Sequence, residues 1–592
     1  MVDGQTGVCK PQWTLRDWLA GIGLFAATAA VVLWQNAHVA VLWDLSYTLD
    51  SAARIAAGQV PYRDFPFVHP PLTFLIQAAI MRLTGRVYFH HVLYAACAGG
   101  LGTVLAWRIA LHSLRGRVDS AWTLALILAA PLTVLGNYCI LPLPSYDCDT
   151  ALAVLVAICL LQRLTPPAAG PASPLRSLLA GFVTGAALCL PLFFKQNIGI
   201  PFLAAACAII LLTLAATRLA RAKSAPRSAW TPLLLAVLAG VGATLLFAAA
   251  LIHFTAGIGN YVHWTIQFAA QRRLPSFGLI LSVYRDPNLL WTLPCILLAL
   301  VLLRSPVRQS LWARWSAFAL MSAPFACALS SLWLYDDADE RGDSLLALWP
   351  LLLILAAALA VNHLLRLRRH AGLSPLLPIL ALAAIHGTFM SQQLWGSTYA
   401  IWPLLILLIA ELIAYLARFS LAERKTPSLP FAMAVVIAIT LLVCGGFYTA
   451  SEERLSYAQF PDGPVQHSAF PELKGLSTPG PWLPEFDELL RYAAANIPPA
   501  DGVILLPGED PFYFATGRIP QFPVLLFDPS TDPYSPAQLA QEVRHRQIRW
   551  LIVKRDLQIK EDSTPQPGET MKLLLQDFKL SARLQGYDVY RR

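Results

Sequence analysis

Three carboxylates stand close together early in the chain, directly after the first long apolar run. They are Asp44, Asp50 and Asp64. Their segment also contains Tyr62 in G-Q-V-P-Y-R-D-F and His69 in H-P-P-L, which we expect to bind substrate, as we do the later His263. Asp44 lies at the expected membrane boundary, where an ionised carboxylate is costly and is therefore more often functional. Such a carboxylate can accept the proton of a hydroxyl group. We expect a catalytic Asp44, with a helix N-cap as the alternative, and structural or solvated roles for Asp50 and Asp64.

A second acidic pair lies at the start of a later apolar run. Asp147 and Asp149 occur in P-S-Y-D-C-D, and both are catalytic candidates, with helix capping as the alternative. Either one, together with Asp44, could hold a divalent cation, because hard oxygen ligands suit Mg²⁺ or Mn²⁺. The chain has no dedicated metal motif, so we predict no metal-binding residue.

Basic side chains that could bind a phosphate group occur in two further places. Lys195 lies in F-F-K-Q-N between two apolar runs, where a lone lysine is either functional or extends its ammonium to the interface. Arg272 and Arg273 follow His263 in a polar stretch, and the arginine fork matches phosphate oxygens. The alternative for the two arginines is a solvated loop.

Composition defines the elements that must position these residues. Of the 592 residues 56% are hydrophobic and only 13% are charged, against about 25% charged in soluble domains. This excludes a soluble multidomain enzyme, a disordered chain and a fibrous repeat. A membrane helix needs about 20 apolar residues, and about thirteen such runs are present. They are near 17–36, 89–110, 120–137, 149–163, 177–194, 198–216, 231–252, 288–304, 313–333, 344–362, 374–391, 398–417 and 429–448.

Charge asymmetry predicts the orientation of these spans. Residues 1–448 contain 29 basic and 16 acidic residues, and 20 of the basic ones fall on one side if the N-terminus is cytoplasmic. The first run is too long for a signal-peptide core, so we interpret it as an uncleaved helix. Two Trp-Pro-Leu-Leu stretches, at Trp349 and Trp402, begin later spans, and we expect their tryptophans to anchor at the membrane interface.

The chain after residue 448 changes character and is expected to lie outside the membrane. Runs Val503–Leu506, Val524–Phe527 and Trp550–Val553 predict strands, and 485–496, 536–546 and 570–580 predict helices. We therefore divide the chain into a transmembrane domain 1–448 with a first external loop 37–88, a linker 449–484, and a small external α/β domain 485–592.

The aspartate after the first span, the G-x-x-P-Y-x-D-F segment and the P-P-L helix start resemble the polytopic GT-C glycosyltransferases. Within this family the chain resembles the RgtA/B/C/D-like, aminoarabinose-transferase and protein-mannosyltransferase types, and the resemblance covers the whole plan of spans, first loop and external domain. It implies an inverting transfer of a sugar from a polyprenyl-phosphate donor to a lipid, glycan or protein acceptor. It places this reaction on the external, periplasmic face of the inner membrane.

The resemblance also implies residue roles. Asp44 becomes the catalytic base, a second acid at Asp147 or Asp149 faces it across the cavity, and Lys195 binds donor. The family often has adjacent acids at the first position, whereas Leu45 follows Asp44 here. A nucleotide-binding G-x-x-x-x-G-K-[ST] loop is absent from the sequence, as expected for a lipid-linked donor. The competing interpretations are a lipid or glycan transporter or flippase, and an envelope assembly protein.

Overall fold

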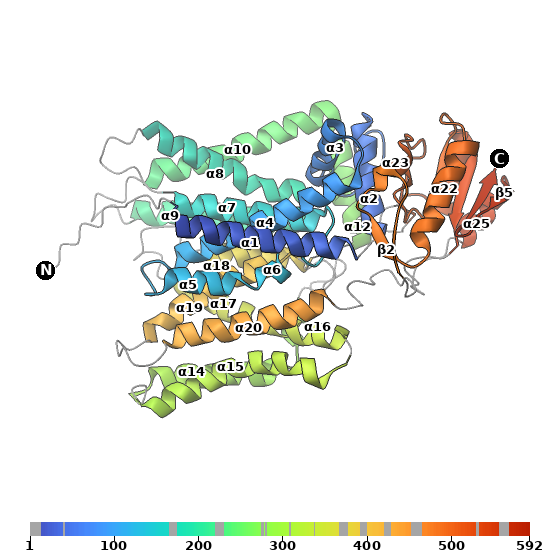
Figure 1. Cartoon of the computed structure of the whole chain (residues 1–592). Coiled ribbons are helices and arrows are strands. Elements are labelled where there is room, and N and C mark those ends of the chain that lie inside the picture. Colours follow the sequence, from blue (N-terminus) through green and yellow to red (C-terminus); the bar gives the residue numbers. More distant parts are fainter. Residues whose placement is uncertain are drawn as a thin grey trace.

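The computed structural model describes residues 13–38, 42–164, 174–219, 230–273, 278, 281–306, 310–336, 338–365, 377–390, 400–419, 428–450, 464–527, 532–555 and 568–592. These residues form a helical bundle with a small sheet-containing domain at one end (Figure 1). The short helices α2 and α3 lie between the two parts.

Helices make up the first part of the chain up to residue 450. Their bounds are α1 Leu15–Asn36, α2 Leu42–Ala56, α3 Leu72–Thr84, α4 Tyr88–Leu114, α5 Ala121–Ala129, α6 Leu132–Leu135, α7 Tyr146–Arg163, α8 Pro174–Phe194, α9 Gln196–Leu219, α10 Trp230–Thr255, α11 Ile258–Val262, the π-helix η2 His263–Phe268, α12 Ala269–Arg273, the 3₁₀ helix η3 Ser282–Arg285, α14 Leu289–Arg304, α15 Leu311–Leu334, α16 Ala338–Leu346, α17 Leu348–Leu365, α18 Leu377–Thr388, α19 Trp402–Leu416, the 3₁₀ helix η8 Ala417–Phe419 and α20 Leu429–Thr449.

Nine helices in the described part of the chain are long and apolar enough to cross a membrane, and four shorter apolar helices accompany them. The described residues of all thirteen predicted spans fall mainly on helices, which confirms a polytopic α-helical membrane protein. The predicted span 120–137 is broken at Pro131 into α5 and α6. The apolar helix α3 begins after Pro70-Pro71, as the sequence indicates.

Glycines let two of the long helices approach each other closely. A Cβ on Gly185 of α8 would lie 2.0 Å from the carbonyl oxygen of Val237 in α10, and one on Gly240 would lie 2.1 Å from that of Phe182. Small residues at such positions bring membrane helix backbones into contact. This contact fixes α8, the helix that leads into Lys195.

The prediction that Trp349 and Trp402 anchor at the interface is wrong. Both are fully buried, and their ring centroids lie 5.4 Å apart in an edge-to-face arrangement. Phe389 stacks on Trp349 at 6.3 Å. The two similar sequences therefore place α17 and α19 around a shared aromatic contact inside the bundle.

The C-terminal domain is built on a four-stranded sheet of order β3-β4-β6-β5. Strands β3 and β4 are parallel, with Val503 opposite Trp550, and the other two pairs are antiparallel. The bounds are β1 Val465–His467, η9 Pro471–Leu473, β2 Ser477–Pro479, α22 Trp482–Asn496, β3 Val503–Leu506, α23 Phe512–Thr516, α24 Pro536–His545, β4 Trp550–Lys554, α25 Gly568–Leu575, β5 Lys579–Arg583 and β6 Tyr587–Arg591.

Two predictions for this domain are wrong in part. The run Val524–Phe527 is irregular, and it is held by burial of Val524 and Leu526 and by a bond from the Phe527 N–H to Pro507. The predicted helix 570–580 ends at Leu575, and Lys579 begins strand β5.

Polar side chains of α2 hold the domain against the bundle. The Ser46 hydroxyl lies within hydrogen-bond distance of the carbonyl oxygens of Gly508 (2.7 Å) and Asp510 (3.0 Å). Asp50 accepts from the backbone N–H groups of Tyr513 (3.3 Å) and Phe514 (2.7 Å). These carboxylate bonds satisfy amides at the start of α23 that have no helical partner.

The Asp50 contact predicts a pH-dependent stability. Burial raises the pKa of Asp50 from 3.8 to about 8, against the opposing effect of its two N–H donors. The folded chain thus keeps a proton that the unfolded chain releases, so the stabilisation is present below about pH 4 and declines as the pH rises toward 8. We expect the free energy of unfolding of the wild type to fall across this window by up to about 1.4 kcal/mol per pH unit. The measurement is the melting temperature in detergent, which should fall over the same pH range.

The matched variant is Asp50→Asn, whose amide oxygen still accepts a hydrogen bond but does not titrate. Its melting temperature should change less with pH than that of the wild type. Parallel profiles for the two proteins would show that Asp50 is ionised throughout.

Candidate functional site

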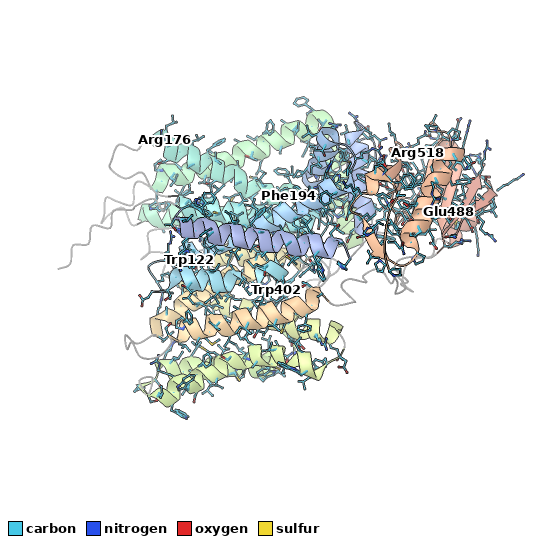
Figure 2. The ribbon with its side chains drawn as sticks, viewed as in Figure 1. Trp122, Arg176, Phe194, Trp402, Glu488 and Arg518 are labelled. Carbon is cyan, nitrogen blue, oxygen red and sulfur yellow. The ribbon has the colours of Figure 1, made fainter. Side chains whose placement is uncertain are left out.

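Lys195 lies at the junction of α8 and α9, at the end of the bundle that carries the C-terminal domain. Arg176 and Phe194 mark the two ends of α8 in Figure 2, and Phe194 is the one nearer the domain. A Cβ on Gly199 would lie 2.3 Å from the Leu192 Cα, so this glycine permits the close turn between the helices. The turn buries Lys195, which is 4% exposed.

The ammonium of Lys195 forms an ion pair with Asp147. The Lys195 Nζ lies 2.5 Å from Asp147 Oδ1, and both side chains are buried. Asp147 is in the first turn of α7, where the Ser145 hydroxyl accepts from its backbone N–H at 3.3 Å. The Nζ also lies 5.2 Å from the ring centroid of Tyr146. Two residues singled out separately by the sequence are therefore direct partners.

Aromatic side chains connect this ion pair to the first loop. The His69 ring stacks on Tyr146 with centroids 4.3 Å apart, and His69 Nδ1 lies 3.1 Å from the Tyr47 hydroxyl. Tyr47 is on α2, one turn after Asp44, so the two side chains are neighbours on that helix. Asp44 itself is half-buried. A continuous line of contacts therefore runs from the Asp44 side of α2 to Lys195.

Tyr62 holds the first loop in an unusual backbone conformation. Its φ is +69°, which is uncommon for a bulky residue and costs energy that surrounding contacts must offset. Its hydroxyl donates to the His69 carbonyl oxygen at 2.6 Å, and its ring packs edge-on against Tyr261 at 5.1 Å. Burial raises the pKa of Tyr62, so its hydroxyl stays protonated.

A later polar segment, α11 to α12, reaches the same place. The Gln196 amide donates to the Thr265 carbonyl oxygen at 3.2 Å, directly beside Lys195. His263 is exposed, and its Nδ1 lies 3.3 Å from Gln267 Oε1. Arg272 and Arg273 end α12, but their side chains lie outside the described residues.

Asp149 occupies a different environment from Asp147. It is 1% exposed and accepts from three hydroxyl groups, those of Thr73 (2.7 Å), Tyr94 (2.7 Å) and Tyr138 (2.5 Å). These bonds join α3, α4 and α7. Its oxygens are thus engaged in joining helices.

The other first-loop acids have structural partners. Asp50 binds α23 as described, and Asp64 pairs with exposed Arg63 at 2.8 Å. Within the described residues, no group of three or more His, Cys, Asp or Glu side chains is arranged to hold a metal ion.

Tyr47 and Tyr146 are members of this cluster that the sequence did not single out. Each lies beside a predicted acid, Tyr47 one turn after Asp44 and Tyr146 next to Asp147. Their position beside candidate acids at a membrane boundary is the sequence feature that could have identified these two tyrosines as site residues.

Comparison with known proteins gives distant structural likenesses. No family model matches the chain, and no curated protein matches it. The structure resembles ArnT from Cupriavidus metallidurans bound to undecaprenyl phosphate, at 14% identity, 98% coverage of both chains and a TM-score of 0.43. It also resembles the oligosaccharyltransferase AglB from Archaeoglobus fulgidus in complex with an inhibitory peptide and a dolichol-phosphate, at 12% identity, covering 92% of this chain and 70% of that one, with a TM-score of 0.47.

The burial of the Lys195–Asp147 pair predicts strong energetic coupling. Lys195→Met or Asp147→Asn alone leaves one charge buried without its partner, which we expect to cost about 3–5 kcal/mol. The double variant removes both charges and should recover most of that loss. Unfolding in detergent of the two single variants and the double variant measures the coupling.

The control cycle uses Arg63→Gln and Asp64→Asn, because this ion pair is exposed. Water screens such a pair, so the effects of the two substitutions should simply add. Additive effects at Lys195 and Asp147 as well would contradict the buried ion pair.

Proposed function

We propose that this chain is a membrane glycosyltransferase that moves a sugar from a polyprenyl-phosphate donor to an acceptor hydroxyl. The supporting observation is the buried ammonium of Lys195 at the domain-facing end of the bundle, joined by Tyr146, His69 and Tyr47 to the helix that bears Asp44. A cation and a carboxylate at opposite ends of one polar cluster suit a reaction that releases a phosphate and takes up a proton.

The donor phosphate is assigned to Lys195. A lysine ammonium has three N–H donors, and Asp147 accepts one of them. Lys195 makes no other hydrogen bond to the described residues, so two donors remain for phosphate oxygens. Asp147 holds the ammonium in place before the donor arrives. We assign Arg272 and Arg273 to the same phosphate, because α12 belongs to the segment that contacts Gln196.

Asp44 is assigned as the base. The acceptor oxygen attacks the anomeric carbon while the bond from that carbon to the phosphate oxygen breaks. The electron pair leaves with the polyprenyl phosphate, and the hydroxyl proton passes to Asp44. Attack opposite the leaving group inverts the configuration at the sugar carbon.

Other residues of the cluster are assigned to positioning. Tyr62 and His69 orient the sugar or acceptor, and His263 lies at the exposed rim of the same region. Asp149 supports the arrangement by joining the helices that carry it. A divalent cation, Mg²⁺ or Mn²⁺, would be held by Asp44, and it would stabilise the negative charge of the departing phosphate.

The proposed topology follows from the charge asymmetry of the sequence. The N-terminus is cytoplasmic, the multi-pass domain 1–448 lies in the inner membrane, and the chain after residue 448, with the C-terminal domain, lies in the periplasm. The polar cluster then faces the periplasm.

The test is Asp44→Asn in the full chain, assayed by release of undecaprenyl phosphate from undecaprenyl-phosphate hexose and pentose donors with membrane extract as the acceptor source. We expect at least about a 100-fold lower rate, because the amide cannot accept the proton. Asp64→Asn is the matched control, since Asp64 is an exposed first-loop acid paired with Arg63. Equal rates for wild type and a folded Asp44→Asn variant would reject Asp44 as the base.

A further inference from the structure

A small hollow of about 20 Å³ lies where the first loop meets the C-terminal domain. Helix α2 contributes Tyr47, Ser51 and Arg54 to its lining, and residues 65–68 and 523–526 form the other walls. Tyr47 belongs both to this hollow and to the cluster that contains His69. The hollow therefore adjoins the proposed transfer site.

Arg54 places a charge in this hollow. The residue is 2% exposed, and its guanidinium carbon lies 4.1 Å from the Phe65 ring centroid. It donates to Gln59 Oε1 at 2.5 Å and to the Pro523 carbonyl oxygen at 2.7 Å. Both acceptors are uncharged, and they use two of the five N–H groups of a guanidinium.

No carboxylate of the described residues forms an ion pair with Arg54. The two acids that act on it electrostatically have other partners: Asp64 pairs with Arg63, and Asp50 binds backbone amides of α23. Burial raises the pKa of Asp50 to about 8, so at neutral pH this group is mainly uncharged.

Burial also lowers the pKa of Arg54 to about 9, which still leaves the guanidinium charged at neutral pH. A buried cation without a counter-charge is costly. An anion bound in the hollow would remove that cost.

Ser51 offers a second donor on the same face of α2. It precedes Arg54 by three residues, so the two side chains are neighbours on the helix. Ser51 lines the hollow, and its hydroxyl makes no hydrogen bond to the described residues. A hydroxyl and a guanidinium fork together form a suitable donor set for phosphate oxygens.

We propose that this hollow binds a phosphate group, with Arg54 and Ser51 as its donors. The assignment of this phosphate to the acceptor rests on the proposed function. The binding of a phosphate in the hollow does not depend on that function. The wall formed by residues 523–526 then gives the C-terminal domain a role, because it closes the hollow over the acceptor. The donor phosphate remains at Lys195, at the other end of the Tyr47–His69–Tyr146 line.

Native mass spectrometry of the detergent-solubilised full chain tests this proposal. The probes are dioctanoyl phosphatidic acid, the matching neutral diacylglycerol, inorganic phosphate and undecaprenyl phosphate. We expect wild type to bind phosphatidic acid at least about tenfold more tightly than diacylglycerol, and Arg54→Gln to lose that preference. Ser51→Ala should weaken binding by a smaller factor of about threefold.

Two control variants separate binding of the phosphate from docking of the domain. Gln59→Ala removes the Arg54 partner and a 3.3 Å bond to Pro520 but keeps the charge. Arg82→Gln removes an arginine that donates to the Ile55 and Ala56 carbonyls at the end of the same helix. Both should retain the preference for phosphatidic acid.

Inorganic phosphate distinguishes the source of the group. Displacement of phosphatidic acid by inorganic phosphate supports a shared site. If wild type binds inorganic phosphate but not phosphatidic acid, and Arg54→Gln loses that binding, the ligand is a soluble phosphate. Equal binding of phosphatidic acid by wild type and Arg54→Gln, with no Arg54-dependent binding of inorganic phosphate, would overturn the proposal. Undecaprenyl phosphate should bind Arg54→Gln as it binds wild type, and failure of wild type to bind it would count against the glycosyltransferase proposal instead.

Discussion

The buried pair of Lys195 and Asp147 is the interaction on which the arrangement of this end of the bundle depends. An ammonium at this depth needs a counter-charge, and Asp147 supplies it from the first turn of α7. The α8–α9 turn must therefore lie against the start of α7, and Gly199 permits this close turn. Replacing such a pair by apolar side chains is often neutral or stabilising in proteins. Binding of a phosphate by the ammonium therefore explains the presence of this ion pair better than a contribution to stability does.

Helix α2 is the second organising element, because it faces both parts of the molecule. Asp50 and Ser46 fix the C-terminal domain through backbone groups, while Tyr47 joins the polar cluster of the bundle. Movement of the domain would therefore disturb the first loop directly. The strained backbone of Tyr62 and its bond to His69 hold the other side of that loop.

The sequence predicted the helical bundle well, because long apolar runs have few alternatives in a membrane. It also predicted strands β3 and β4, whose apolar residues are mostly buried and which pair in parallel at one side of the sheet. The run Val524–Phe527 has the same composition, but its side chains are buried without a neighbouring strand, and composition does not distinguish these cases.

The candidate site was predictable residue by residue but not as an assembly. Lys195 and Asp147 were singled out separately, yet they are 48 residues apart and on different elements, so their pairing depends on helix packing. Arg54 has the appearance of a solvated residue on an amphipathic helix. It is buried because the first loop and the C-terminal domain both cover it.

The central claim is that Lys195 is present to bind a lipid phosphate. The most direct measurement compares the polyprenyl phosphate retained by purified wild type and by the double variant Lys195→Met/Asp147→Asn, quantified by mass spectrometry of extracted lipids after incubation with undecaprenyl phosphate. The double variant lacks the cation without leaving a buried charge unpaired. We predict bound undecaprenyl phosphate on wild type and at least about tenfold less on a folded double variant. Equal retention by the two proteins would contradict the account.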